Sequence, residues 1–109
     1  MESNSSPFVL MQRAEGQIKA VLRAVDVDVL TPDEKKAFAT VKRLATDARL
    51  DIRDYELSET RDEQLKCAVS ARKRLSKLQA AILGTGQAFG PADVAQLGAQ
   101  LEQIAGRLV

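Results

Sequence analysis

Apolar residues recur at alternating spacings of three and four between residues 31 and 57, with polar and charged residues between them. The apolar positions are Phe38, Val41, Ala45, Ala48, Ile52 and Tyr55. This spacing puts them on one narrow stripe of a helix, the kind of surface that one helix offers to another. Thr31 and Glu34 form a capping-box pair around Pro32, a residue type favoured at the first helical position. We therefore predict a helix over about residues 32–57.

The segment before this helix carries a stripe of the same kind. Ser6 and Pro7 resemble an N-cap and a first helical residue. The apolar face that follows holds Met11, Ala14, Ile18, Val21, Leu22 and Val25. We predict a helix over about residues 7–26, preceded by a flexible polar tail over residues 1–6. Its exit has two interpretations, because residues 25–29 alternate valine and aspartate with the period of a strand. We favour a frayed helix end, and a short extended piece is the alternative.

Two more helices are predicted after residue 57. Thr60 and Glu63 form a second capping-box pair, which starts a helix over about residues 61–83. Its inner face is predicted to hold Leu65, Ala68, Val69, Ala71, Leu75, Leu78 and Ile82. A glycine-rich loop over residues 84–90 separates it from a last helix over about residues 91–108. The stripe of that helix holds Val94, Leu97, Leu101, Ile104 and Leu108.

Four helices with short connections, each with one apolar stripe, predict an all-α fold. The expected architecture is an antiparallel four-helix bundle with a central hairpin formed by the second and third helices. The chain has 109 residues, one domain's worth, and we predict a single helical-bundle domain over residues 1–109. Aromatic residues make up only 4%, so the core must rest on Leu, Ile, Val and Ala, a mixture that favours helices over sheets.

The overall charge points to no class of partner. The 16 basic and 15 acidic side chains leave a net charge of +1, so no long-range field draws the chain to nucleic acid or to a membrane. No segment reaches the roughly 20 apolar residues that span a bilayer, and no basic region precedes the first short apolar run. The single cysteine, Cys67, excludes an internal disulfide framework and fits a reducing compartment. We therefore expect a cytoplasmic protein without membrane contact.

The sequence offers little catalytic chemistry. It contains no histidine, which removes imidazole bases, His-paired nucleophiles and His-containing metal sites. Asp47, Asp51 and Asp54 follow one another at helical spacing, with Arg43 one turn before Asp47, and we interpret them as a solvated charged face. The glycines of the 84–90 loop end a helix rather than follow a strand, unlike a dinucleotide-binding loop. We expect no catalytic residue, no cofactor and no metal, and we predict that the protein is not an enzyme.

A basic face on the third predicted helix is the first candidate for partner binding. At about 100° per residue, Lys66, Lys73 and Lys77 line up opposite the core stripe, with Arg74 to one side. These side chains could meet the phosphates of RNA or DNA, or an acidic protein surface. They could also serve solubility alone, because no aromatic residues are interleaved with them. Cys67, at the edge of the core stripe, is interpreted as a small boundary hydrophobe.

A leucine pair on the second predicted helix is the other candidate. Leu50 and Leu57 are seven residues apart, and the helical wheel places them away from the stripe that runs from Phe38 to Tyr55. Leucines outside one core often lie in a second one, formed with another helix or another subunit. Single leucines are also common on surfaces, so the spacing alone leaves both interpretations open.

Two short segments resemble known families. Residues 13–19, RAEGQIK, are similar to the first-helix RxEGQ(I/V)(K/R) stretch of the CsoR-type copper-sensing repressors, which are helical oligomers that bind DNA. The Cys-His-Cys copper ligands of that family have no counterpart in this sequence. Residues 45–54, ATDARLDIRD, look like the helix of the small NifX-associated hairpin proteins of nitrogen-fixation clusters, but the turn that follows lacks their proline and tryptophan. Neither similarity carries over a functional residue.

We therefore predict a small, non-catalytic helical interaction or assembly module that binds a protein partner or itself. Its candidate partner-binding residues are Leu50, Leu57, Lys66, Lys73, Arg74 and Lys77. A nucleic-acid-binding regulatory protein, which would use the basic face of the third helix, is the alternative.

Overall fold

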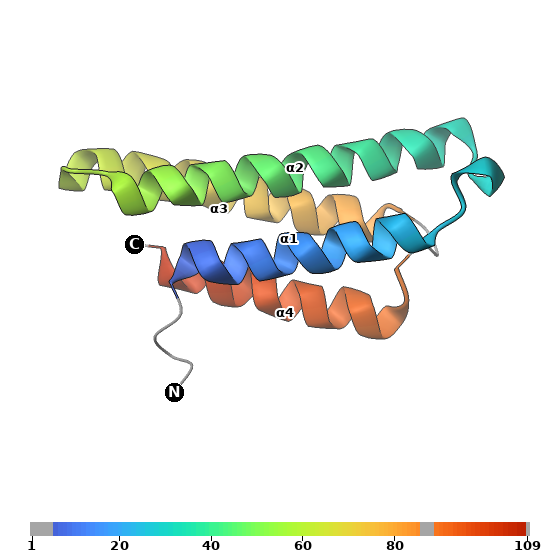
Figure 1. Cartoon of the computed structure of the whole chain (residues 1–109). Coiled ribbons are helices and arrows are strands. Elements are labelled where there is room, and N and C mark those ends of the chain that lie inside the picture. Colours follow the sequence, from blue (N-terminus) through green and yellow to red (C-terminus); the bar gives the residue numbers. More distant parts are fainter. Residues whose placement is uncertain (1–5, 86–88, 109) are drawn as a thin grey trace.

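The structure is a computed structural model that describes residues 6–85 and 89–108. Its described part contains four α-helices, one short 3₁₀ helix and no strand (Figure 1). The bounds are Pro7–Ala24 for α1, Val27–Val29 for η2, Pro32–Leu57 for α2, Arg61–Leu83 for α3 and Pro91–Arg107 for α4. Of the predicted tail only Ser6 is described, and the middle of the predicted 84–90 loop, residues 86–88, also lies outside the described part. The predicted all-α fold is confirmed.

Side chains cap the first two helices at the predicted positions. Ser6 Oγ accepts a hydrogen bond from the backbone amide of Val9 at 3.2 Å, which begins α1. At α2 both halves of the capping box are formed. The Glu34 amide donates to Thr31 Oγ1 at 3.1 Å, and the Thr31 amide donates to Glu34 Oε1 at 2.9 Å. Because amides in the first turn of a helix lack partners within the helix, such a cap is worth about 1 kcal/mol.

The start of α3 has a simpler cap than predicted. The Glu63 amide donates to Thr60 Oγ1 at 3.2 Å, so Thr60 is the N-cap. The return bond from the Thr60 amide to the Glu63 carboxylate is absent among the described residues, and the predicted capping box is therefore half formed. The Glu63 side chain instead lines a depression on the outer surface of the hairpin.

The segment that joins α1 to α2 is neither a frayed helix end nor a strand. Helix α1 ends at Ala24, and Val25 has extended backbone angles, φ −89° and ψ 134°. Asp26 Oδ1 then accepts a hydrogen bond from the Asp28 amide at 3.0 Å, which starts η2. The alternation of valine and aspartate therefore does not reflect a sheet, because the aspartate side chain hydrogen-bonds its own backbone two residues on.

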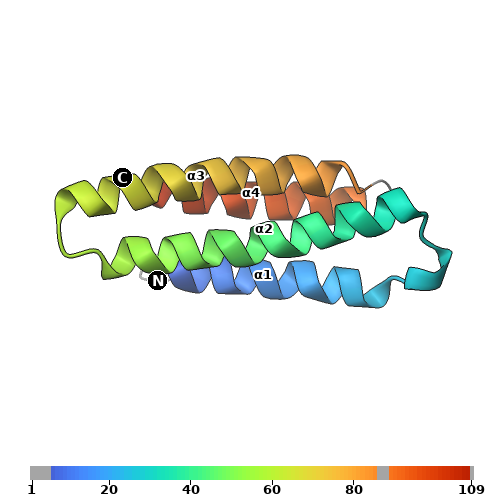
Figure 2. The same cartoon turned by 90° about the horizontal axis from the view of Figure 1, so that it is seen from above.

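The four helices pack as an antiparallel bundle in the ring order α1, α2, α3, α4. In Figure 1, α2 and α3 form one layer and α1 and α4 form the other. In Figure 2, which looks down on the first layer, α2 lies over α1 and α3 over α4. The interface between α2 and α3 is the most extensive, and α1 also packs on α2 and α4, as α3 does on α4. The predicted central hairpin is thus the largest element of the fold.

The core agrees with most of the predicted stripes. All six stripe positions of α2 are buried, together with Leu44. Helices α1, α3 and α4 contribute buried side chains at Met11, Ala14, Ile18, Ala68, Ala71, Leu75, Leu78, Ile82, Leu97, Leu101 and Ile104. Two predicted core positions on α3 are wrong: Leu65 is 38% exposed and Val69 is 49% exposed.

The helices that pack together differ in length. Helix α2 has 26 residues and α3 has 23, whereas α1 has 18 and α4 has 17. The Arg72 guanidinium donates a hydrogen bond to the Leu108 carbonyl, so the end of α4 lies beside Arg72. Within the part of α3 before Arg72, residues 61–71, the first turns extend past the end of α4, as Figure 1 shows. We call this segment the α3 overhang.

Candidate functional site

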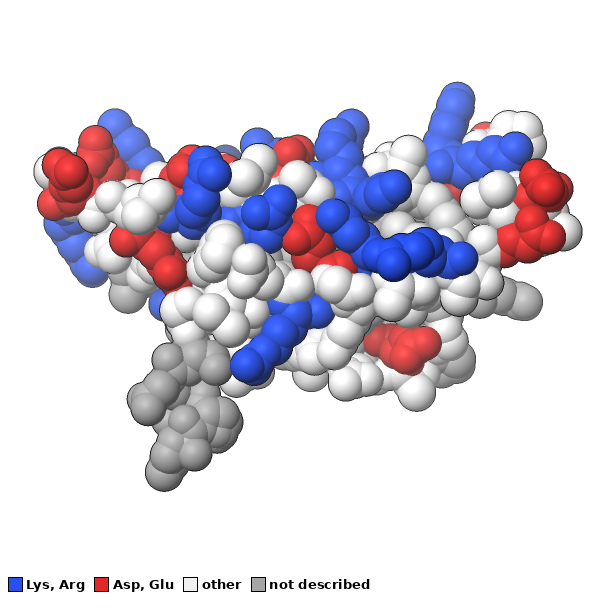
Figure 3. Space-filling model, viewed as in Figure 1, with Lys and Arg blue, Asp and Glu red and all other residues white. Residues whose placement is uncertain are grey.

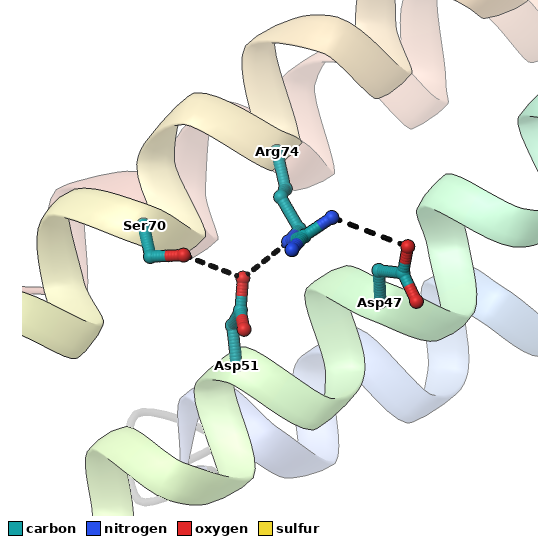
Figure 4. A network of polar contacts seen from close by, with 4 residues as sticks. All are labelled: Asp47, Asp51, Ser70 and Arg74. Carbon is teal, nitrogen blue, oxygen red and sulfur yellow. Dashed lines mark hydrogen bonds and ion pairs between the residues drawn. The ribbon is translucent and has the colours of Figure 1, made fainter.

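The predicted basic face of α3 divides into two parts. Lys66, Lys73 and Lys77 are exposed, as predicted, and none of them has an ion-pair partner among the described residues. Arg74 is turned toward α2 instead (Figure 4). Its Nε lies 2.6 Å from Asp51 Oδ2 and its terminal Nη1 lies 3.2 Å from Asp47 Oδ2. The three lysines are therefore free to meet a partner, whereas Arg74 is engaged within the hairpin.

The Arg74 contacts also change the interpretation of the aspartates on α2. Asp47 and Asp51 are only partly exposed, and Asp51 also accepts a hydrogen bond from Ser70 Oγ at 3.0 Å (Figure 4). Asp47 pairs across the hairpin rather than with Arg43 on its own helix. Because residues four apart share a helix face, Ser70 and Arg74 can both contact Asp51, and Arg74 also reaches Asp47. Asp47 and Asp51, which were predicted to be solvated, therefore connect α2 to α3. Of the three aspartates only Asp54 is exposed.

A buried carboxylate, which was not among the residues predicted from the sequence, joins α1 to α2. Glu15 is only 7% exposed. Its Oε1 lies 2.7 Å from Arg49 Nε, and its Oε2 accepts a hydrogen bond from Thr46 Oγ1 at 3.0 Å. Lys19 Nζ, one turn along α1, lies 3.3 Å from the same Oε2. Three donors therefore surround this carboxylate, as a buried charge requires.

A sequence signal for this carboxylate existed but was weak. Glu15 follows Ala14 directly and so lies at the margin of the apolar face of α1. It also belongs to the RAEGQIK stretch that resembles the copper-sensing repressors. The register that brings Arg49 opposite Glu15 cannot be found from either helix alone.

The two candidate leucines of α2 differ in exposure. Leu50 is half-buried, whereas Leu57, at the end of the helix, is 69% exposed. Leu57 lines a shallow depression of about 380 Å³ between α2 and α3, which Lys66 and Cys67 also line. Ser58 Oγ lies 3.8 Å from the sulfur of the half-buried Cys67, and the two groups form a weak hydrogen bond. The structure thus brings together Leu57 and Lys66 among the candidate residues, and it places Lys73 and Lys77 two and three turns further along α3.

A larger cleft lies at the other end of the bundle, between α1, η2 and α2. It has a volume of about 800 Å³. Its apolar lining residues are Leu22, Val25, Val27, Phe38 and Ala39, and its charged lining residues are Lys19, Arg23, Asp26 and Lys42. We call it the α1–α2 cleft. None of these residues was singled out as a binding residue from the sequence, because the cleft depends on the 3₁₀ turn that replaced the predicted helix end.

Among the residues that the structure describes, no group of three or more His, Cys, Asp or Glu side chains could hold a metal ion. Over the same residues, no helix combines the length and the apolar character needed to cross a membrane. Comparisons of the chain with known protein families, with curated proteins and with solved structures found no match.

Proposed function

We propose that this chain is a non-catalytic helical interaction module that self-associates through the α3 overhang. The proposal rests on one observation: Leu65 and Val69 lie one turn apart on the part of α3 before Arg72, and both are exposed. Residues four apart lie on one side of a helix, and exposed apolar side chains grouped in this way are a candidate surface for another helix. A second copy of the chain carries the same overhang, so two overhangs can cover each other about a two-fold axis.

The test is the mass of the chain in solution, measured by light scattering over a range of concentrations. We expect the wild-type chain to exceed the monomer mass, and Leu65→Glu with Val69→Glu to return it to the monomer. Val29→Glu with Leu83→Glu is the matched control, because it also places two acids at exposed apolar positions, away from the overhang. Circular dichroism checks that every variant stays helical. A wild-type chain that remains monomeric at millimolar concentration overturns self-association.

The leucine pair of α2 supplies a second face for the same experiment. Leu50→Asp with Leu57→Asp is expected to lower the mass if the α2 face contributes to the assembly, and an unchanged mass excludes that face. A heterologous protein partner is the other form of this proposal. Affinity capture from the native host with wild-type chain and with the overhang variant, followed by mass spectrometry, separates a partner that binds the overhang from one that does not.

The proposed setting is the cytoplasm. Cys67 is a free thiol, and a lone thiol fits a compartment that keeps cysteines reduced. Fractionation of native cells, followed by detection of the chain in the cytosolic fraction, tests this assignment.

The alternative proposal is a nucleic-acid-binding regulator, and the exposed lysines of α3 favour it. Lys73 and Lys77 lie four residues apart and can contact neighbouring phosphates together. We expect the chain to shift a duplex or a single strand in a gel at low salt, and Lys73→Glu with Lys77→Glu to weaken the shift. Lys35→Glu with Lys36→Glu makes the same change of charge elsewhere. If no shift occurs at low salt, the alternative fails.

A further inference from the structure

The α1–α2 cleft combines an apolar floor with a cationic rim. Leu22 and Val25 from α1 and its exit, Val27 from η2, and Phe38 and Ala39 from α2 supply the apolar surface. Val27 remains 55% exposed, so part of this surface faces water in the free chain. An apolar ligand in the cleft would remove that surface from water, which is favourable by roughly 25 cal/mol per Å².

The charges at the rim are three cations against one carboxylate. The cations are Lys19, Arg23 and Lys42, and the carboxylate is Asp26. Asp26 Oδ1 accepts the hydrogen bond that starts η2, and the charge of this carboxylate offsets one of the three cations. Arg23 and Lys42 have no ion-pair partner among the described residues. The rim therefore carries an uncompensated positive charge.

Glu15 holds the Lys19 side chain in place but does not fully neutralise its positive charge. Its ammonium lies 3.3 Å from Glu15, but the same carboxylate is also held by Arg49 at 2.7 Å. One negative charge is thus shared between two cations. Figure 3 shows the result on this face of the molecule, where Lys and Arg side chains gather over the second half of α1 and the facing part of α2. With a net charge of only +1 for the whole chain, this gathering is a local feature.

We propose that the α1–α2 cleft binds a free single-chain amphiphile, with its apolar chain on the valine and leucine floor and its anionic headgroup, a carboxylate or a phosphate, among Lys19, Arg23 and Lys42. The volume of about 800 Å³ falls within the range of small-molecule sites, roughly 300–1,000 Å³. None of the described residues that line the cleft is an Asn, Gln, Ser, Thr or Tyr whose side chain could hydrogen-bond the polar edges of a base or a sugar. An apolar chain with one anionic end uses both parts of the cleft.

Two fluorescent probes separate the contributions of charge and apolar contact. One is 8-anilinonaphthalene-1-sulfonate, and the other is N-phenyl-1-naphthylamine, which has the same ring system without the sulfonate. We expect the anionic probe to bind at one saturable site and the neutral probe to bind more weakly. Decanoate and decyl phosphate should each displace the anionic probe, and their order of potency identifies the preferred headgroup. Amide shifts in NMR spectra during the decanoate titration should be confined to the α1 exit, η2 and the facing turns of α2.

Charge reversal at the rim tests the cationic part of the site. Arg23→Glu with Lys42→Glu is expected to raise the dissociation constant of the anionic probe by about tenfold or more, the loss of two partly exposed charge contacts, while the neutral probe is unaffected. Lys73→Glu with Lys77→Glu changes the net charge equally on α3 and should leave both probes unaffected. Ala39→Phe should fill the cleft and weaken both probes, whereas Ala99→Phe, at an exposed position of α4, should weaken neither.

Three results would overturn the proposal. The first is the absence of saturable binding of the anionic probe or of decanoate up to millimolar concentration. The second is an equal loss of binding in the rim and α3 charge variants, which would show a general charge effect. The third is binding to phosphatidylglycerol vesicles without binding of monomeric decanoate, which would identify a membrane surface and not a free amphiphile as the ligand.

Discussion

At the scale of single residues, the polar contacts that matter join one helix to another. Glu15 on α1 is held by Thr46 and Arg49 on α2, and Arg74 on α3 is held by Asp47 and Asp51 on α2. Helix α2 is therefore tied to both of its sequence neighbours by charge-assisted hydrogen bonds. Apolar contacts alone allow neighbouring helices to pack in more than one register. These hydrogen bonds favour a single register, because their donors and acceptors meet in only one.

Replacement of the buried carboxylate tests the first of these links. We expect Glu15→Gln to lower the free energy of unfolding by about 1–3 kcal/mol, because Arg49 and Lys19 lose the charge that they share. Urea denaturation followed by circular dichroism measures the change. Glu102→Gln, an exposed position on α4, is the control and should change the free energy by less than about 0.5 kcal/mol. Equal stability of the two variants would show that the Glu15 contacts add nothing.

The second link is tested by Arg74→Met, which keeps an unbranched chain of similar length and removes the guanidinium. The side chain is 39% exposed, so solvent screens part of the interaction and the expected loss is about 1 kcal/mol. Lys77→Met removes a cation from the same helix without removing an ion pair and should be nearly neutral. If both variants unfold at the same urea concentration, the contacts in Figure 4 do not stabilise the hairpin.

At the scale of helices, Gly98 of α4 faces the end of the Gln79 side chain of α3. A Cβ atom at this position would lie 3.1 Å from Gln79 Nε2 on α3, whereas a Cβ atom at Gly16 of α1 would meet nothing within 4 Å. Both glycines lie inside helices, where alanine is favoured by roughly 0.5–1 kcal/mol. The same substitution therefore has a different steric cost at the two positions.

We expect Gly16→Ala to raise the free energy of unfolding by about 0.5–1 kcal/mol, the full gain in helix propensity. Gly98→Ala should gain less than half as much, because the Gln79 side chain must move to admit the new methyl group. Parallel urea titrations of the two variants measure the difference. An equal gain at both positions would mean that Gln79 moves aside without cost.

The limits of prediction from sequence also lie at the scale of helices. The starts of α1 and α2 were predictable because a cap is a local signal: Ser6 and Thr31 bond to amides three residues away. The exposure of Val69 could have been predicted, because it lies three residues after Lys66 and four before Lys73, on the side of the exposed lysines. The exposure of Leu65 is harder to predict, because a helical wheel shows which positions share a stripe and not where the neighbouring helix ends. That depends on the register that places Leu108 beside Arg72.

For the candidate residues too, local features were predictable from the sequence and contacts between helices were not. The exposure of Lys66, Lys73 and Lys77 follows from their place opposite the core stripe, and it was predicted. The engagement of Arg74 and the burial of Glu15 depend on which residues face them across an interface, so neither helix alone contains that information. The α1–α2 cleft was missed for a third reason, since its wall is formed by the turn that Asp26 starts.

At the scale of the whole molecule, the bundle is uneven: the central hairpin is long and the two outer helices are short. Two halves of α3 therefore have different surroundings. The half after Arg72 packs against α4 as well as α2, whereas the first turns of the overhang extend past the end of α4 (Figure 1). Local opening of a helix requires less free energy where fewer apolar contacts are lost. The overhang should thus be the part of α3 that opens most readily in a monomer and the part that gains most from assembly.

Hydrogen exchange at two protein concentrations tests whether the overhang opens readily in the monomer and whether assembly stabilises it. At low concentration, where the monomer dominates, amides of residues 65–71 should exchange faster than amides of residues 75–82 on the same helix. At high concentration, self-association through the overhang should slow exchange of residues 65–71, while the mid-α1 amides stay unchanged and serve as the internal control. In the Leu65→Glu with Val69→Glu variant the dependence on concentration should disappear. Uniform exchange along α3 at low concentration would contradict the uneven packing, and exchange independent of concentration in the wild-type chain would contradict assembly through this surface.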